Sequence, residues 1–323
     1  MSKPAFSVVV TACNRADMLA DALGSVRAQT FGDYELIVVD DASTDDTAAV
    51  AEQFGARVLR QPTNQGVAAA RTRAVREANA DFIAFLDDDD RWPTWTLATY
   101  AAALAEHPDA TIVSGVSVDF DKIDATPHAE PKWVRHDDYF AFRSRLPEEW
   151  LVPSGMAVRR SALLAAGPFN QKMVRSSDSE MWLRLGVEPG FVRVTQPPVF
   201  GFRHHAQRIT ANPRPLLDSM REMLRKSRVG AFPGGTARAT ERRSIVSLHT
   251  RNAARGLARR GSKWAGVKLW AASLPLQLRA GRWRFVLGYP VEMWLWPIKD
   301  ARKRRRRRKA AQLSTPTLTP QSA

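Results

Sequence analysis

Residues 6–41 read FSVVVTACNRADMLADALGSVRAQTFGDYELIVVDD, and this stretch decides the fold class. Residues 6–13 and 34–41 are apolar runs rich in β-branched side chains, which is typical of buried strands. Residues 15–29, between them, carry apolar side chains at helical spacing. Two strands joined by a helix of this length indicate a βαβ unit, whose strands lie parallel in one sheet.

The alternation of strands and helices continues to residue 120. Further strands are expected at 56–61, 81–87 and 111–120, and further helices at 43–55 and 66–80. This pattern predicts an α/β fold with a Rossmann-like, mostly parallel sheet that carries helices on both faces.

Polar clusters follow three of the predicted strands: Cys13–Asn14, Asp40–Asp41 and Asp87–Asp90. In open parallel sheets, ligands bind beyond the carboxyl ends of the strands. We therefore expect the three clusters to face one crevice.

The third cluster belongs to the segment DFIAFLDDDDRW, residues 81–92. Adjacent carboxylates repel one another unless a cation neutralises them, and Mg²⁺ or Mn²⁺ with oxygen ligands does so. A metal–diphosphate site is one interpretation of the run. The other is a solvated acidic turn, with Asp90 opening a helix at Trp92–Pro93.

The second cluster and the third helix add groups that suit a nucleotide. Asp40 and Asp41 could accept the N–H of a uracil ring or the hydroxyls of a ribose. Asp45 and Asp46 fit the first turn of a helix, where negative charge is favourable. Arg71, about a turn and a half into its helix, could reach a nucleotide or a phosphate.

Taken in order, these segments resemble the inverting family 2 glycosyltransferases, which have the GT-A fold. The similarity covers roughly residues 5–210. It rests on SVVVTACNRADMLADALGSVRAQTFGDYELIVVDDASTDDT, NQGVAAARTRAV, FIAFLDDDDRW, VPSGMAVRRSALLAAGPFN, SSDSEMWLRL and FGFRHHAQRIT. Cys13, Thr72, Ser177 and Phe202 depart from the residues usual in the family.

The resemblance implies a role for each matching residue. Asp41 would bind the nucleotide base, with Asp40 beside it, and Arg71 would help to hold the nucleotide. In the Asp-x-Asp pair, Asp87 would lie near the ribose and Asp89 would contact the metal, Mg²⁺ or Mn²⁺, with Asp88 between them. Asp178 would be the general base, with Glu180 as its competitor, and His205 would help to hold the diphosphate or the metal.

The activity implied is metal-dependent, inverting transfer of a sugar from a nucleotide sugar, expected to be a UDP-sugar. The acceptor would be a hydroxyl of a saccharide or lipid-linked saccharide in cell-surface polysaccharide or glycolipid synthesis. One alternative is a nucleotidyltransferase, although TACNRADM lacks the Gly-rich phosphate loop of that class. Another is a non-catalytic nucleotide-sugar or nucleic-acid binder, against which the retained Asp41, Asp87, Asp89 and Asp178 argue.

Charge divides the chain into an acidic and a basic part. Residues 1–210 hold 22 Lys and Arg against 28 Asp and Glu, a net charge of −6, whereas residues 211–323 hold 26 against 5, a net charge of +21. We expect a catalytic domain over residues 1–210. A basic, Trp-containing helical extension would follow at 211–300, and a poly-Arg and disordered tail at 301–323.

The basic part suggests a partner of opposite charge. Trp residues lie among Arg and Lys in the predicted extension, and RKRRRRRK follows at 302–309. This combination suits an anionic membrane surface. Nucleic acid is less expected, because the first 210 residues contain no recognition module.

The remaining features of the sequence concern the cellular compartment of the protein. Cys13 is the single cysteine, so no intrachain disulfide framework is expected. The N-terminal apolar run is too short for a signal peptide. Residues 285–298 form the longest apolar stretch of the basic part, but its 14 residues include Glu292 and two prolines, and a spanning helix needs about 20. We expect a cytoplasmic protein, peripheral on the inner face of the cell membrane.

Overall fold

The computed structural model describes residues 3–126, 128–149, 151–204, 213–293 and 295. The chain divides into two compact units, Met1–Leu248 and His249–Ala323. His205 and residues 301–323, for which the sequence made specific predictions, lie outside the described residues.

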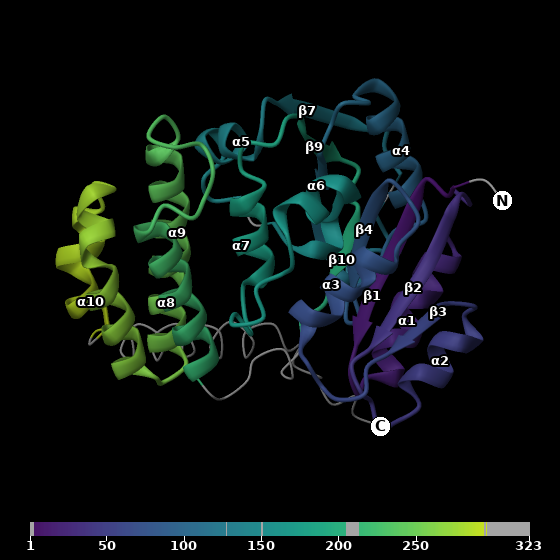
Figure 1. Ribbon diagram of the computed structural model, residues 1–323, viewed down its shortest axis with the longest axis horizontal. Coiled ribbons are helices and arrows are strands. Elements are labelled where there is room, and N and C mark those ends of the chain that lie inside the picture. Colours follow the sequence, from purple (N-terminus) through teal and green to yellow (C-terminus); the bar gives the residue numbers. More distant parts are fainter. Residues whose placement is uncertain (1–2, 127, 150, 205–212, 294, 296–323) are drawn as a thin grey trace, which may run out of the picture. The chain divides into compact units, whose positions relative to one another are not determined.

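The first unit is built on an eight-stranded sheet with the order β3-β2-β1-β4-β8-β5-β9-β7 (Figure 1). Its strands are β1 (Phe6–Ala12), β2 (Tyr34–Asp40), β3 (Arg57–Arg60), β4 (Phe82–Asp87), β5 (Ile112–Gly115), β7 (Lys132–His136), β8 (Met156–Arg159) and β9 (Phe191–Gln196). The first four are parallel to one another, β8 is antiparallel to β4 and β5, and β7 is antiparallel to β9. The predicted α/β architecture with a mostly parallel sheet is confirmed.

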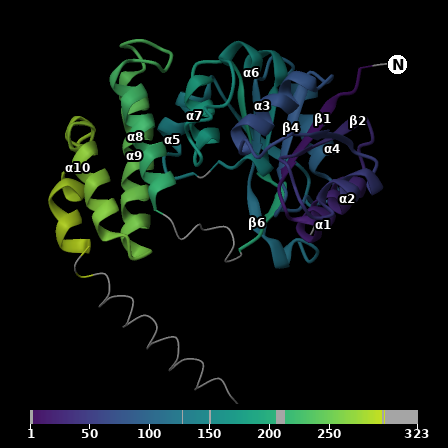
Figure 2. The same cartoon turned by 60° about the horizontal axis from the view of Figure 1, so that its bottom comes forward.

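Helices cover both faces of this sheet, and Figure 2 shows the two layers apart. One layer holds α1 (Ala16–Arg27), α2 (Thr47–Gln53) and α4 (Thr96–Glu106); the other holds α3 (Val67–Glu77), α6 (Arg160–Ala166) and α7 (Ser177–Arg184). Val8 and Val10 join Leu19 and Leu23 of α1 in the core of the first layer. Successive strand residues face opposite sides of the sheet, so neighbouring apolar residues of a strand pack against different helix layers.

Phe85 of β4 packs against the second layer of helices through aromatic contacts. Its ring lies 6.4 Å from that of Trp182 on α7 and 6.0 Å from that of Phe169. The side chain of Trp182 is almost completely buried, so this residue belongs to the core. The position of α7 over β4 is what brings the first turn of the helix towards the acidic end of that strand.

The region between residues 111 and 204 is more structured than the sequence indicated. The expected strand 111–120 is divided into β5 and β6 (Ser117–Asp119), and β6 pairs with β10 (Phe200–Phe202) in a separate two-stranded sheet. Helix α5 (Tyr139–Arg145) and 3₁₀ turns at Phe120–Lys122 and Pro153–Gly155 complete the region.

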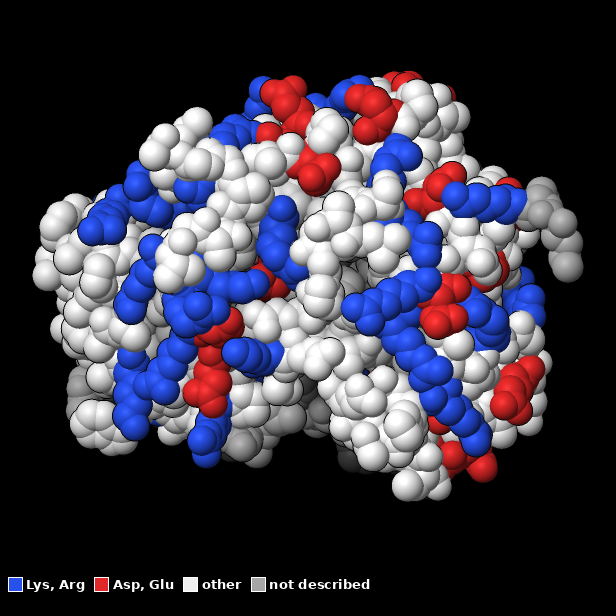
Figure 3. Space-filling view, in the orientation of Figure 1, with Lys and Arg blue, Asp and Glu red and all other residues white. Residues whose placement is uncertain are grey.

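The predicted helical extension is present after residue 212. Helix α8 (Arg214–Arg228) belongs to the first unit and buries Leu217, Met220, Met223 and Leu224. Helix α9 (Ala239–Arg259) crosses the boundary between the units, and the second unit continues with α10 (Lys263–Arg279) and a further helix at 283–293. On the face drawn in Figure 3, Lys and Arg side chains gather over α8 and α9. Within the described residues, no helix has the length and apolar character needed to cross a membrane.

Candidate active site

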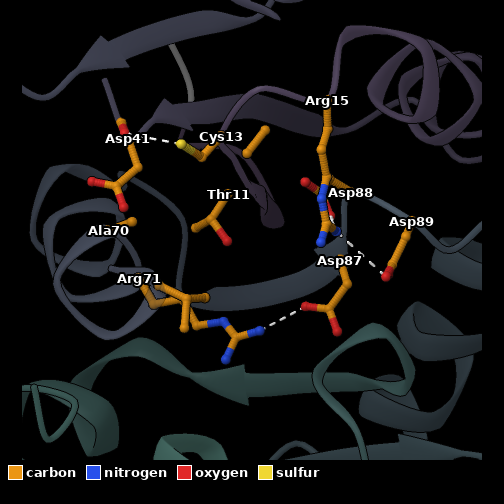
Figure 4. Close-up of a pocket in the computed structure, with 11 residues that line it drawn as sticks. Thr11, Cys13, Arg15, Asp41, Ala70, Arg71, Asp87, Asp88 and Asp89 are labelled. Carbon is orange, nitrogen blue, oxygen red and sulfur yellow. Dashed lines mark hydrogen bonds and ion pairs between the residues drawn. The ribbon is translucent and has the colours of Figure 1, made fainter. Parts of the chain in front are cut away.

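The carboxyl ends of β1, β2 and β4 and the beginning of α3 open into one cavity of about 300 Å³ (Figure 4). The cavity is lined by Thr11, Ala12, Cys13, Arg15, Asp41, Val67, Ala70, Arg71, Asp87, Asp88 and Asp89. The expectation that the three strand-end clusters share one crevice is therefore confirmed.

Asp41 organises the loop that leads into α3. Its Oδ1 accepts hydrogen bonds from the Gln61 side-chain amide at 2.6 Å and from the Gln65 backbone N–H at 2.8 Å. Its Oδ2 accepts from the Gly66 N–H at 2.8 Å. Gly66 has φ 83°, a conformation that glycine adopts without steric cost. Both oxygens of Asp41 thus fix the start of the helix that carries Arg71.

Asp40 does not line the cavity. Its carboxylate is buried, and Oδ1 accepts the Ser43 backbone N–H at 3.0 Å, which turns the chain after β2. The next helix begins at Thr47, so Asp45 and Asp46 precede it and do not lie in its first turn, where the sequence predicts them. Asp45 Oδ1 accepts the Thr47 N–H at 3.0 Å. Of Asp40 and Asp41, therefore, only Asp41 lines the cavity.

Arg71 and Asp87, which both line the cavity, are paired with each other (Figure 4). The Arg71 guanidinium donates from Nη2 to Asp87 Oδ1 at 2.6 Å. Charge-assisted hydrogen bonds of this kind are short and directional. The pair holds one cation and one carboxylate at fixed positions beside the strand end, where an incoming ligand would meet both.

Arg15 is a second cavity cation, and sequence reasoning missed it. Its Nη1 donates to Asp88 Oδ1 at 2.9 Å and lies 3.5 Å from Asp89 Oδ2. Burial raises the pKa of Asp88 to about 7, with Arg15 opposing the rise and the carboxylates of Asp89 and Asp87 adding to it. The signal in the sequence was a cation two residues after Cys13, at the same strand end as the acids.

The four consecutive aspartates have separate environments. Ligand oxygens of Asp87, Asp89 and Asp90 lie within 4.8 Å of one another, which is compatible with one hard cation. Asp90 is fully buried, accepting from Ser154 Oγ at 2.6 Å and from the Arg203 N–H at 3.1 Å. It does not open a helix at Trp92–Pro93, because α4 begins at Thr96. Asp87 and Asp89 are the members of this group that line the cavity.

Asp178 and Glu180 lie in the first turn of α7 but differ in surroundings. Burial raises the pKa of Asp178; the charge of Arg71 opposes this rise and that of Asp87 adds to it. Asp178 is thus within electrostatic range of two cavity residues, although it is not among the residues that line the cavity. Glu180 is completely buried, pairs with Lys226 of α8 and lies 3.1 Å from the Nε of Arg184. Glu180 is therefore engaged in structural ion pairs.

The residues that depart from the family pattern have local partners. Cys13 donates from Sγ to the Asp41 carbonyl at 3.3 Å and accepts from Asn64 Nδ2 at 3.2 Å. Thr72 donates to the Ala68 carbonyl at 2.7 Å and accepts the Phe169 N–H at 3.0 Å, so it joins α3 to the segment before α7. The structure does not describe His205, the predicted partner of the metal or diphosphate.

The fold and the site define an α/β domain with acidic residues around a cavity at the strand ends. Comparison with known proteins agrees with this class. Residues 7–166 match the family model described as "Glycosyl transferase family 2". This part of the chain belongs to that family.

Two relatives illustrate the sequence similarity. A "PGL/p-HBAD biosynthesis glycosyltransferase" of Mycobacterium bovis is 38% identical over 121 residues, covering 36% of this chain and 47% of the relative. The "Putative teichuronic acid biosynthesis glycosyltransferase TuaG" of Bacillus subtilis is 33% identical over 144 residues, covering 42% and 57%. The chain spans about half the length of these curated relatives.

Two solved structures share the GT-A fold. S. aureus TarS 1-349 in complex with UDP-GlcNAc aligns with a TM-score of 0.63 at 17% identity, covering 91% of this chain and 92% of that one. The mannosyltransferase PcManGT of Pyrobaculum calidifontis, in complex with GDP-Man and Mn²⁺, aligns with a TM-score of 0.53 at 19% identity, covering 91% and 88%.

Proposed function

We propose that this protein is an inverting glycosyltransferase. It transfers a sugar from a nucleotide sugar, expected to be a UDP-sugar, to a hydroxyl of a saccharide or lipid-linked saccharide. The observation that carries the proposal is the meeting of Asp41, Arg71, Asp87 and Asp89 at one cavity of a family 2 domain. The names of the relatives, which refer to PGL/p-HBAD and teichuronic acid biosynthesis, support a role in cell-surface polysaccharide or glycolipid synthesis.

The cavity suits the donor in size, and in charge when a divalent cation offsets its excess of carboxylates. Its volume of about 300 Å³ is at the lower end of the range for small-molecule sites. We expect Asp41 to meet the base, with Asp40 supporting the turn after β2. We expect Asp87 to lie near the ribose, with Asp88 adjacent to it. Arg71 supplies positive charge for the phosphates.

The acidic residues fit a divalent metal ion, Mg²⁺ or Mn²⁺. Hard cations of this kind take carboxylate oxygens, and the oxygens of Asp87 and Asp89 lie within 4.8 Å of each other. We expect Asp89 to be the main ligand, with Asp87 beside it and His205 as a further candidate. When bound, such an ion would supply Lewis-acid stabilisation of the charge that develops on a diphosphate leaving group.

Asp178 is the proposed general base. A base must be deprotonated to accept the proton of the acceptor hydroxyl, and a pKa above the ordinary carboxylate range strengthens it as a base. Burial raises the pKa of Asp178 in this way. Glu180 is a poor candidate, since Lys226 and Arg184 occupy its carboxylate. Attack by the activated hydroxyl opposite the leaving diphosphate would invert the anomeric centre.

The test is a panel of UDP-, GDP- and dTDP-sugars with Mn²⁺, measured by release of nucleotide in the presence of saccharide acceptors. Asp178→Asn should lower transfer by about 10²–10⁴-fold while leaving nucleotide affinity nearly unchanged. Asp109→Asn is the matched control, because Asp109 is exposed and pairs with Arg135 away from the cavity. Transfer by Asp178→Asn at the wild-type rate would show that the base is assigned wrongly.

A further inference from the structure

Exposed apolar side chains concentrate in the second unit. Half of the large apolar side chains that are exposed in the described residues lie between positions 264 and 295, about a tenth of the chain. Trp264 is 78% exposed, Leu287 72%, and Trp283 and Val291 58% each. Large side chains of this kind are ordinarily buried, and a group of them left in contact with water indicates an interaction surface.

The helix at 283–293 is apolar on two opposite sides. Phe285, Tyr289 and Met293 are buried on one side, where the Tyr289 hydroxyl donates to the Ala254 carbonyl at 2.9 Å. Trp283, Leu287 and Val291 recur every fourth residue on the other side and are exposed. Side chains at this spacing share one face of a helix. The helix is thus held to its own unit by one face and presents the second to its surroundings.

Helix α10 is likewise buried on one side and exposes large apolar side chains on another. Gln277 is buried and donates from Nε2 to Thr250 Oγ1 at 3.0 Å. Trp264 and Leu278, 14 residues apart and so on one helical face, are exposed. We call Trp264 and Leu278, together with Trp283, Leu287 and Val291, the apolar stripes.

The charge around the apolar stripes indicates which kind of partner would cover them. Residues 249–295 contain nine Lys and Arg but a single acidic residue, Glu292, whose carboxylate is held by Arg255 at 3.0 Å. The sequence then continues with eight consecutive cations at 302–309. A second copy of this unit would be repelled by the same charge, whereas an anionic surface would be attracted. Trp beside Lys and Arg is the composition that suits a lipid headgroup region.

We propose that the second unit docks on a phospholipid bilayer with anionic headgroups. The apolar stripes enter the interfacial layer without crossing the membrane, and the basic side chains around them contact the headgroups. The inference goes beyond the proposed transfer reaction and rests on none of its residues.

The test is flotation of the full-length protein with vesicles of phosphatidylcholine alone or mixed with phosphatidylglycerol. Wild-type protein should bind the anionic vesicles. The triple variant Trp283→Gln/Leu287→Gln/Val291→Gln should lower the partition coefficient by about tenfold or more, because it removes apolar area that enters the interface. Val174→Gln/Val229→Gln is the matched control, since these residues of the first unit are 66% and 65% exposed, and it should bind as wild type.

Two single variants distinguish apolar docking from attraction by charge alone and from misfolding. The single changes Trp264→Gln and Leu287→Gln alter exposed side chains of different helices, and each should weaken binding by a smaller factor that persists at high salt. The proposal is overturned if wild type binds no vesicles or if the triple variant binds as tightly as wild type. It is also overturned if wild type forms dimers that the triple variant loses while neither binds lipid. The proposed sugar transfer is measured separately, as nucleotide release with a water-soluble acceptor. A failure of membrane binding can therefore be distinguished from a failure of the proposed transfer.

Discussion

The ammonium group of Lys226 on α8 pairs with the buried carboxylate of Glu180 on α7, two residues after Asp178. Arg184 approaches the same carboxylate at 3.1 Å. The two acids of this helical turn therefore differ: cations neutralise Glu180, whereas burial raises the pKa of Asp178, with the charge of Arg71 opposing that rise and that of Asp87 adding to it. A helix beyond residue 210 thus supports the helix that carries the proposed base.

Glu180→Gln should destabilise the protein without removing the base. The change leaves Lys226 and Arg184 without their shared anion, and loss of one partner of a buried pair costs about 3–5 kcal/mol. Urea unfolding should show this loss, and nucleotide affinity below the unfolding transition should be nearly unchanged. Asp218→Asn, whose half-exposed carboxylate pairs within α8, should cost less than about 1 kcal/mol. Equal stability of the Glu180 and Asp218 variants would contradict the structural role.

Arg15→Gln should make the protein more dependent on a divalent cation. Arg15 lies within 3.5 Å of the carboxylates of Asp88 and Asp89, so its removal increases their mutual repulsion. In EDTA the midpoint of thermal unfolding should fall. Mn²⁺ should then raise this midpoint more in the variant than in wild type, because an ion bound to the folded state stabilises it.

Arg91→Gln is the control for this experiment. Arg91 pairs with the exposed Asp124 and does not line the donor cavity. Mn²⁺ should shift its unfolding midpoint as it shifts that of wild type. The same Mn²⁺ shift in the Arg15 variant, the Arg91 variant and wild type would refute a role for Arg15 in balancing the acidic residues.

The strands of the site could be predicted because each is a continuous apolar run. β1, β2 and β4 fill the sheet interior, and polar residues begin where each strand ends, so both the elements and the shared crevice were predictable from local sequence. Strand β8 was not predictable in this way. Its four residues lie between β4 and β5 and pair with both, through contacts that are remote in sequence.

Side-chain partners were the least predictable feature for the same reason. Arg15 meets Asp88 across 73 positions, and Lys226 meets Glu180 across 46. The sequence indicates a cation and an acid in each case, but only packing of the elements brings them together. Asp90 shows the converse: its position before Trp92–Pro93 favoured a helix start, yet burial against Ser154 and Arg203 determines its role.

The stability of the metal-free protein should fall with pH through the titration of Asp88. Its pKa is raised from 3.8 to about 7 in the folded state, so the folded protein holds a proton that the unfolded chain has released. The resulting stabilisation is fully present below about pH 4 and is lost as the pH rises through about 7. In EDTA, the free energy of unfolding of wild type relative to Asp88→Asn should therefore decline between pH 5 and pH 8. Parallel curves for the two proteins would disprove the raised pKa.

Asp41→Asn should weaken both the fold and nucleotide binding. The Asp41 carboxylate accepts three hydrogen bonds, from Gln61, Gln65 and Gly66. An asparagine would turn an N–H group towards one of these donors. Because hydrogen bonds to a charged group contribute about 1.5–3 kcal/mol, urea unfolding without nucleotide should show a loss of about that size.

The nucleotide affinity of Asp41→Asn should fall further than its stability alone requires, since the loop that positions α3 and Arg71 would shift. Asp46→Asn is the control: Asp46 is exposed before α2 and makes no capping hydrogen bond, so its stability should change by less than about 0.5 kcal/mol. If Asp41→Asn lost nucleotide affinity but unfolded like wild type, Asp41 would serve the ligand alone. If it lost stability but kept wild-type affinity, the residue would only support the loop. We expect both losses together, because the same carboxylate shapes the loop and borders the cavity.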